Sequence, residues 1–395
     1  LFEATVYGVG LILGAGIYAI LGEAAGAAGG SVVISFVLAA TIAALTGLSY
    51  AELSARFPKE EGDYLYVREA FADRRIAEVT ALLRLLVGVI SAAAVALAFG
   101  GYLAAFAAIS VVPAALAIVG MMALVNFWGI AFSARLNVLF TVIEVIGLLL
   151  IIALGVGSFG RVQPLDMPAG GAGIVRGAFL IFFAYIGFGS IVNVSEETAD
   201  ASRTIPRAIV LAIAITTVLY VLVGAAAVAL VSPAALGASD SPLALVARAG
   251  MGPGAAAVVA AIALFSTTNT VLILEVSTSR LLYGVSKTEY EFFPPWLAAV
   301  HSGRQTPYRA VAAIGVLTGA FVLLGDLALV AGLANLLLLV VFVLVNAALI
   351  KLRVDHPVPE TGFRVPLAVG RIPVTAVGGL VSCLALAVFY VLDGL

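Results

Sequence analysis

The sequence predicts an all-α integral membrane protein, and three observations lead to that fold class. Hydrophobic residues make up 63% of the 395 residues, charged residues make up 11%, and the mean hydropathy is +1.19. A soluble domain could not hide so much apolar surface from water. The apolar residues are also grouped into runs long enough to cross a bilayer, so we expect the chain to lie in lipid.

Each long apolar run predicts one crossing, because a helix that rises 1.5 Å per residue needs about 20 residues to span the hydrocarbon core. Eleven runs cover residues 3–27, 31–55, 76–107, 112–130, 133–158, 173–198, 206–232, 253–285, 307–325, 327–352 and 373–393. The chain starts at Leu1 inside an apolar stretch that is too long for a cleaved signal peptide. We therefore expect a trimmed terminus.

The connections on one side of the predicted membrane domain carry most of the basic residues. The opposite connections carry only Arg161, Arg176 and Arg248. Under the positive-inside rule, the basic side is the cytoplasm, so the N-terminus is cytoplasmic and the first helix runs outward. The cytoplasmic set is Arg56, Lys59, Arg68, Arg74, Arg75, Arg135, Arg203, Arg207, Lys287, Arg304, Arg309, Lys351, Arg353, Arg364 and Arg371.

Glycine-containing sequences interrupt two otherwise continuous apolar spans. They are Gly14-Ala15-Gly16 in the first span and Gly187-Phe188-Gly189 in the sixth. Because they recur five spans apart, and five is odd, the second set of five helices enters the membrane from the opposite side, as in an inverted-topology repeat. We predict two halves, residues 1–158 and 173–353, followed by an additional C-terminal span in residues 354–395. The alternative is that the glycines only allow close helix packing.

Four groups of motifs resemble, in the right order, those of the amino acid-polyamine-organocation superfamily. The glycine-rich residues 8–18 (GVGLILGAGIY) are similar to its first-helix signature, which ends in GxGIF. The others are residues 51–53 (AEL) with Arg56, Pro58 and 62–66; residues 182–188 (FFAYIGF) with 195–197 (SEE) and 204–209 (TIPRAI); and residues 266–270 (STTNT) with 279–284 (SRLLYG).

This resemblance covers essentially the whole chain and is nearest to prokaryotic cationic-amino-acid-transporter-like and ApcT-like permeases. It implies the leucine-transporter fold, with helices one and six broken at mid-membrane. It also implies a prokaryotic plasma membrane location and a monomer that works without a partner protein. Members usually have twelve spans, so a twelfth span here is either lost or trimmed.

An amino acid zwitterion needs a partner for each of its charges at mid-membrane. Unwinding around Gly14 would free N–H groups for the carboxylate, and unwinding around Gly187 would free carbonyls for the ammonium. By resemblance, the carboxylate meets Ile12, Ala15 and Gly16. The ammonium meets Phe183, Ala184 and Ile186, and Phe183 is also a candidate lid.

Glu144 lies inside the fifth span, where an ionised carboxylate without a partner costs about 2.5–3.5 kcal/mol. ApcT-like permeases typically have lysine here, reaching a first-helix carbonyl and an eighth-helix serine, which correspond to Gly10 and Ser266. Three interpretations follow. Glu144 is a proton carrier that donates to the Gly10 carbonyl; or it forms a sodium site with Gly10 and Ser266; or it pairs with a base such as Arg84.

Two more charges, Glu275 and Arg84, lie in the eighth and third spans. Glu275 is either a selectivity or relay acid, or a partner for Arg84 or Ser279. Near the cytoplasmic ends, acidic and basic residues form either a closing ion-pair network or solvated helix caps. They are Glu52, Glu196, Glu197 and Arg280.

The leading hypothesis is a secondary active transporter of L-amino acids that is coupled to protons and alternates access around a midplane site. Sodium coupling, exchange, and an amino acid sensor that does not transport are the alternatives. The chain lacks a GxxxxGK[ST] loop, a nucleophile-base pair and a metal cluster, which disfavours a pump or an enzyme. We expect no cofactor beyond the coupling ion, H+ or Na+, and the net charge of -2 gives no reason to expect nucleic acid. The breaks contain no acid, which favours neutral substrates.

Overall fold

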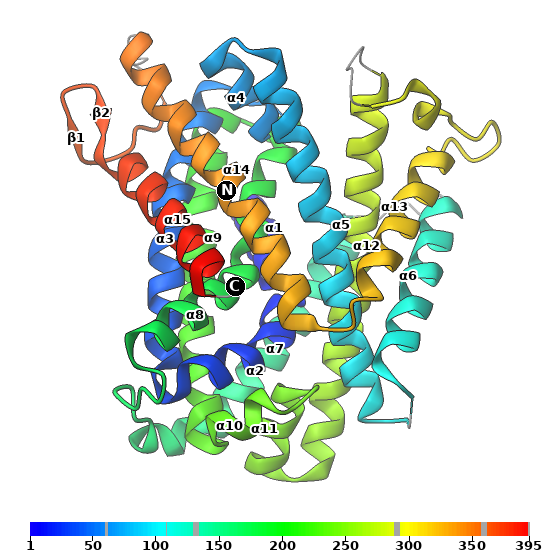
Figure 1. The fold of residues 1–395 in the computed structure, drawn as a ribbon, viewed down its shortest axis with the longest axis vertical. Coiled ribbons are helices and arrows are strands. Elements are labelled where there is room, and N and C mark those ends of the chain that lie inside the picture. Colours follow the sequence, from blue (N-terminus) through cyan, green and yellow to red (C-terminus); the bar gives the residue numbers. More distant parts are fainter. Residues whose placement is uncertain (60–61, 108, 129–133, 288–292, 357–361, 394–395) are drawn as a thin grey trace.

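The computed structural model describes residues 1–59, 62–107, 109–128, 134–287, 293–356 and 362–393, with the backbone alone for residues 134–139. This described part is mainly helical and contains one pair of two-residue strands (Figure 1). β1 (Ala368–Val369) pairs antiparallel with β2 (Ile372–Pro373), directly before the last helix. The prediction of an all-α chain is therefore confirmed.

The helices have the following bounds. The first part of the chain forms α1 (Phe2–Leu13), α2 (Gly16–Ala28), η1 (Gly29–Ser31), α3 (Val32–Arg56), α4 (Gly62–Phe71), α5 (Arg74–Ala104), α6 (Val111–Trp128), α7 (Ala134–Gly155) and η2 (Val156–Arg161). The second part forms α8 (Gly170–Phe182), η3 (Phe183–Val194), α9 (Ala201–Leu230), α10 (Pro233–Gly237), α11 (Pro242–Met251), α12 (Pro253–Lys287), η4 (Pro295–Ala298), α13 (Tyr308–Val322), α14 (Leu327–Asp355) and α15 (Val374–Asp393).

Nine helical segments in the described residues are long and apolar enough to cross a membrane. The first of them runs from Gly16 to Arg56 and joins two predicted spans, while the predicted ninth span is the shorter helix α13. The predicted first span is split into α1 and α2. The predicted sixth span corresponds to α8 and η3 together. Each other predicted span corresponds to one apolar helix, and the bounds agree within a few residues where both ends are described. The division into inverted repeats stays a prediction.

The helices pack in two groups, which lie beside each other in Figure 1. We call α5, α6, α12 and α13 the scaffold group, because every pair among these four helices is in contact. We call α1, α3, α8, η3 and α9 the bundle group; within it, α9 packs on α1, α3 and η3. Helix α14 contacts both groups, through α5 and α3. We refer to the end of the molecule at α4 as the α4 end, and to the opposite end as the α11 end.

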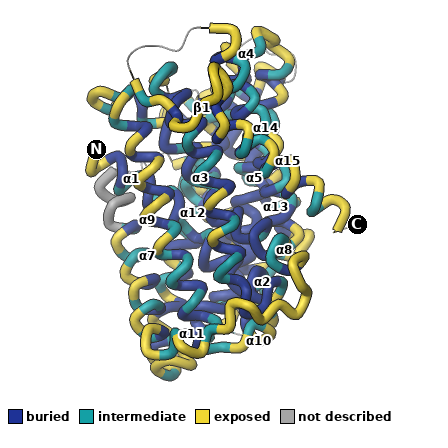
Figure 2. The backbone as a smooth tube through the Cα atoms, turned by 90° about the vertical axis from the view of Figure 1, so that its left-hand side faces the viewer, coloured by how far each residue is buried: buried dark blue, intermediate teal, exposed yellow. Residues whose placement is uncertain are grey.

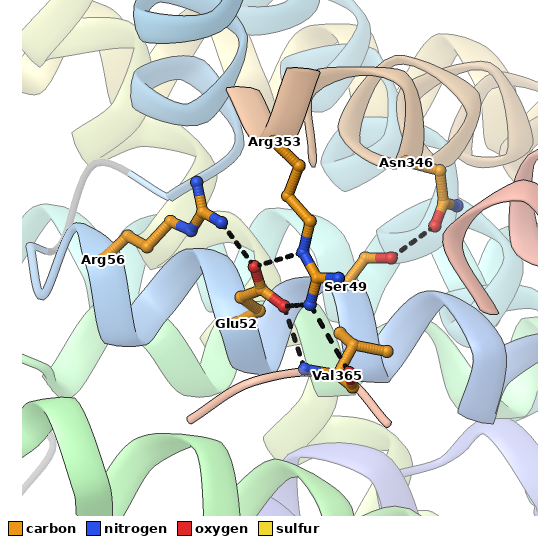
Figure 3. Close-up of polar contacts among 6 residues, drawn as sticks. All are labelled: Ser49, Glu52, Arg56, Asn346, Arg353 and Val365. Carbon is orange, nitrogen blue, oxygen red and sulfur yellow. Dashed lines mark hydrogen bonds and ion pairs between the residues drawn. The ribbon is translucent and has the colours of Figure 1, made fainter. Parts of the chain in front are cut away.

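Polar residues fasten α14 to α3 (Figure 3). Asn346 of α14 accepts a hydrogen bond from Ser49 Oγ at 2.7 Å. Its Nδ2 also donates to Thr46 Oγ1 at 3.1 Å. Nearer the α4 end, the buried Arg353 forms a bidentate ion pair with the buried Glu52. Every polar atom named here has a partner, as buried polar groups require.

Glu52 is the centre of this second contact. Its carboxylate also accepts from Arg56 at 2.7 Å and from the Val365 N–H at 2.9 Å (Figure 3). Glu52 therefore takes part in an ion-pair network with Arg353 and Arg56, and a closing role for this network stays a prediction. Glu196, Glu197 and Arg280 are exposed instead, in agreement with the solvated alternative.

The exposed surface between the two ends is largely apolar. Figure 2 shows buried residues along the middle of the molecule and exposed residues on its outer faces. The exposed large apolar side chains include Met121, Leu124, Ile146, Val218 and Leu384, all within membrane-length helices. Such a surface is stable next to lipid and not next to water.

Candidate substrate and coupling site

The first span is broken at Gly14 and Ala15. α1 ends at Leu13, and Gly14 has φ −8° and ψ −162°, which is not a helical conformation. The N–H of Gly14 still reaches the Gly10 carbonyl at 3.3 Å, whereas the N–H of Ala15 donates to the Thr270 side chain of α12 at 3.1 Å. α2 then begins at Gly16. The break thus turns a main-chain donor away from the helix axis, toward a side-chain oxygen.

The sixth span differs from the prediction in one respect. The chain does not unwind into an extended segment at Gly187; α8 passes at Phe183 into the 3-10 helix η3, which continues to Val194. A 3-10 helix of this length is uncommon, and such stretches often occur at functional hinges. Within this 3-10 helix, Gly187 approaches the main chain of α1 closely.

The two interrupted spans lie against each other. A Cβ atom on Gly16 would come within 2.8 Å of the Ala184 Cα, and one on Gly187 would overlap the Leu11 carbonyl and lie 2.9 Å from the Ile12 nitrogen. The structure therefore brings together the two sets predicted for the substrate. These are Ile12, Gly14, Ala15 and Gly16 on one side, with Phe183, Ala184, Ile186 and Gly187 on the other.

Tyr220 of α9 connects the two interrupted spans. Its hydroxyl is buried and lies 2.7 Å from the carbonyl oxygen of Ile12 and 3.3 Å from that of Ala184. A tyrosine hydroxyl has one proton, so it donates to these two carbonyls in turn. Neither Tyr220 nor Thr270 was predicted as a site residue. A polar side chain inside an apolar span was the available signal, but without a contact partner it did not distinguish these residues from other such positions.

Glu144 and Ser266 meet directly. The Ser266 hydroxyl donates to Glu144 Oε1 at 2.8 Å, and the Glu144 side chain is 1% exposed. The backbone carbonyl of Glu144 also accepts from the Tyr18 hydroxyl at 3.2 Å. Gly10 packs against Thr141, one helical turn before Glu144. The three predicted coupling residues thus lie where α1, α7 and α12 meet.

Arg84 takes part in a different contact from the predicted ones. Its Nε lies 3.1 Å from Asp63 Oδ2, and its Nη2 donates to Ser190 Oγ at 2.9 Å. The interpretation in which Glu144 pairs with Arg84 is therefore wrong, and so is the pairing of Glu275 with Arg84. Asp63 was missed because it lies in a polar connection, where hydropathy gives no sign that a short helix folds back.

Glu275 has no hydrogen-bond partner for either carboxylate oxygen among the described residues, and it is 1% exposed. Ser279, the other predicted partner, accepts from Asn126 at 3.1 Å and donates to the Val276 carbonyl at 3.1 Å. Neither structural interpretation of Glu275 holds. The described residues also contain no group of three or more His, Cys, Asp or Glu that could hold a metal ion.

Comparison with known proteins gives the function of this arrangement at the level of the family. The sequence model of a family described as amino acid permease matches residues 1–394. The chain belongs to the amino acid permease family. This permease is therefore a multi-pass membrane transporter of amino acids and not an enzyme, and membership implies the leucine-transporter fold.

Individual relatives of the permease match along most of its length. It is 32% identical to an uncharacterized transporter of Mycobacterium tuberculosis, over 98% of this chain and 84% of the relative. It is 30% identical to the methylthioribose transporter of Bacillus subtilis, over 95% of this chain and 85% of that protein. It is 28% identical to a branched-chain amino acid permease of the same organism, over 92% and 83%.

Proposed function

We propose that this permease is a proton-coupled symporter that takes up neutral L-amino acids across a prokaryotic plasma membrane, with its N-terminus in the cytoplasm. The observation that carries the proposal is the contact between the two interrupted spans. Tyr220 there holds two carbonyls, of Ile12 and Ala184, whose oxygens are suited to an ammonium group. The Ala15 N–H, now bonded to Thr270, is suited to a carboxylate.

The substrate class follows from charge. The residues of the two breaks, 12–16 and 183–187, include no Asp, Glu, Lys or Arg, so a cationic or acidic substrate side chain would find no charged partner among them. Apolar residues such as Phe183, Ala15 and Val271 share one buried cluster beside the breaks. A neutral, apolar side chain suits these surroundings, and the relative named as a branched-chain amino acid permease agrees with this choice.

Alternating access is proposed as rocking of the bundle group against the scaffold group. The breaks belong to the bundle side, and Thr270 belongs to α12 of the scaffold group, so the Ala15–Thr270 hydrogen bond crosses the boundary. Substrate at this boundary would contact both groups. It could therefore couple its own binding to their relative position.

The substrate prediction is tested by thermal unfolding of the detergent-solubilised permease in the presence of each of the twenty amino acids and of methylthioribose. We expect branched-chain and other neutral amino acids to raise the melting temperature, because a ligand that binds only the folded state stabilises it by mass action. The same ligands should then drive counterflow in proteoliposomes. Binding without flux would favour a sensor, and a shift by methylthioribose alone would overturn the amino acid assignment.

Proton coupling is assigned to Glu144, and Glu144→Gln tests it. Glutamine has a similar volume and can still accept from Ser266, but it cannot release a proton. We expect accumulation driven by a pH gradient to fall to the level of empty liposomes, while counterflow of unlabelled against labelled substrate persists. Unchanged proton-driven accumulation would remove Glu144 from the mechanism.

The sodium alternative predicts a different pattern in the same vesicles. Glu144, Ser266 and the Gly10 carbonyl are oxygen ligands of the kind that hard cations favour. If they hold sodium, a sodium gradient alone drives accumulation by the wild-type permease, and a pH gradient does not. Glu144→Asp is the matched control, since it keeps an ionisable carboxyl within the same surroundings.

A further inference from the structure

A second set of polar side chains lies between the breaks and the α4 end. It consists of Tyr50 from α3, Asp63 and Tyr66 from α4, Arg84 from α5 and Ser190 from η3, and we call it the α4 cluster. Arg84 lies at its centre, paired with Asp63 at 3.1 Å and bonded to Ser190 at 2.9 Å. The rings of Tyr50 and Tyr66 are 6.1 Å apart, edge to face.

Several groups of the α4 cluster keep unused hydrogen-bonding capacity. Asp63 Oδ1 and the hydroxyls of Tyr50 and Tyr66 are buried and have no hydrogen-bond partner among the described residues. The Asp63 carboxylate and the Tyr50 hydroxyl approach each other, but not in the geometry of a normal hydrogen bond. Buried polar groups are normally paired, so three unpaired ones in one cluster indicate a place where a polar ligand can bind.

The α4 cluster lies between the interrupted spans and the α4 end of the molecule. Ser190 follows Gly187 by three residues, which is one turn of a 3-10 helix. Tyr50 packs edge to face on Phe188 at 5.6 Å between ring centroids. A molecule that leaves the interrupted spans toward the α4 end would therefore meet these side chains within about one turn.

Arg84 also bridges the two helix groups. It belongs to α5 of the scaffold group, whereas Ser190 and Tyr50 belong to η3 and α3 of the bundle group. Relative movement of the groups must therefore break the Arg84–Ser190 hydrogen bond.

We infer that Arg84 and Asp63 form a second, transient site for the zwitterionic substrate, which the ion pair itself closes when no substrate is bound. This inference rests on the proposed transport of neutral amino acids. The substrate carboxylate replaces Asp63 on the Arg84 guanidinium, whose planar donors match a carboxylate. The substrate ammonium binds Asp63, and the hydroxyls of Tyr50 and Tyr66 satisfy the remaining oxygens.

The exchange of partners leaves no charge alone at any step. Before exchange, the guanidinium and the carboxylate of the protein neutralise each other; after exchange, each has the opposite end of the zwitterion as its partner. An unpaired charge in this buried cluster would be costly. Replacing the Arg84–Asp63 pair by two ion pairs with the substrate keeps that cost low. Amino acids thus gain a stepwise route between the central site and the α4 end.

The experiment measures half-saturating substrate concentrations of counterflow separately from the two faces, in vesicle populations of defined orientation. For Asp63→Asn and Arg84→Gln, we expect the half-saturating concentration at the α4 end to rise about tenfold or more, since truncating one partner of a close charge pair has effects of this size. The value at the α11 end and the thermal shift by substrate should stay at the wild-type level. Arg68→Gln is the matched control, because its ion pair with Glu69 on the same helix α4 is exposed.

The possible outcomes separate this inference from the proposed function. If wild-type vesicles transport amino acids but both variants change the two faces equally, or change neither, the transient site is wrong and the transport proposal stands. If the wild type neither binds nor transports amino acids, both fall together. Should either variant fail to fold, Arg84→Lys and Asp63→Glu keep the charges and must still give a one-sided increase, smaller than that of the truncations.

Discussion

Gly187→Ala abolishes amino acid uptake and lowers the melting temperature of the permease. The added Cβ would overlap the Leu11 carbonyl and lie 2.9 Å from the Ile12 nitrogen, and both are main-chain atoms. A side chain could rotate away from a methyl group, but here α1 itself must shift, and that shift displaces the carbonyl that Tyr220 holds. Overpacking costs about 1–3 kcal/mol or more, and contact with backbone places this variant at the upper end.

The matched control for this variant is Gly120→Ala in α6. No atom lies within 4 Å of the position that a Cβ on Gly120 would take, and alanine favours a helix over glycine by about 1 kcal/mol. We expect uptake and melting temperature at or above the wild-type values. Substrate-dependent uptake in proteoliposomes and thermal unfolding measure both variants. Normal uptake by Gly187→Ala would show that the close approach of the two spans is not required.

Hydropathy was sufficient to predict most of the membrane helices, because the bilayer imposes the same length and apolar composition on every span. It could not predict that the sixth span tightens into η3. Gly187 of η3 packs against Leu11, which is far away in the sequence, and hydropathy carries no information on such a neighbour. The sequence was sufficient to predict interruptions at Gly14 and Gly187, but not the backbone conformation at each of them.

The candidate site likewise contains one contact that could be predicted from the sequence and one that could not. The meeting of Glu144 with Ser266 could be anticipated, since the resemblance carries a spatial relationship from one helix to another. The partner of Arg84 could not. Asp63 lies in α4, a short helix inside a polar connection, and only the folded chain places it against α5. Local composition does not reveal a pair that forms between a loop segment and a transmembrane helix.

Glu52→Leu is expected to cause the largest loss of stability. Glu52 is 1% exposed and is the counterion of Arg353, which is 4% exposed, so leucine leaves a buried guanidinium without its carboxylate. Removing one member of a buried ion pair typically costs about 3–5 kcal/mol. The Val365 N–H also loses its acceptor, which weakens the contact between Val365 and α3. A marked fall in melting temperature and in the yield of monodisperse protein measures the effect.

The double variant Glu52→Leu with Arg353→Met distinguishes loss of an attraction from exposure of an unpaired charge. Replacing both members of a buried pair by apolar residues is often nearly neutral, so the double variant should regain most of the stability lost by Glu52→Leu alone. Lys351→Met is the control, since its pair with Asp355 is partly exposed and such pairs contribute only about 0.3–0.5 kcal/mol. If the double variant were no more stable than Glu52→Leu, the loss would come from the Arg56 and Val365 contacts instead. The Glu52 carboxylate would then stabilise the protein mainly through Arg56 and Val365, and not through its ion pair with Arg353.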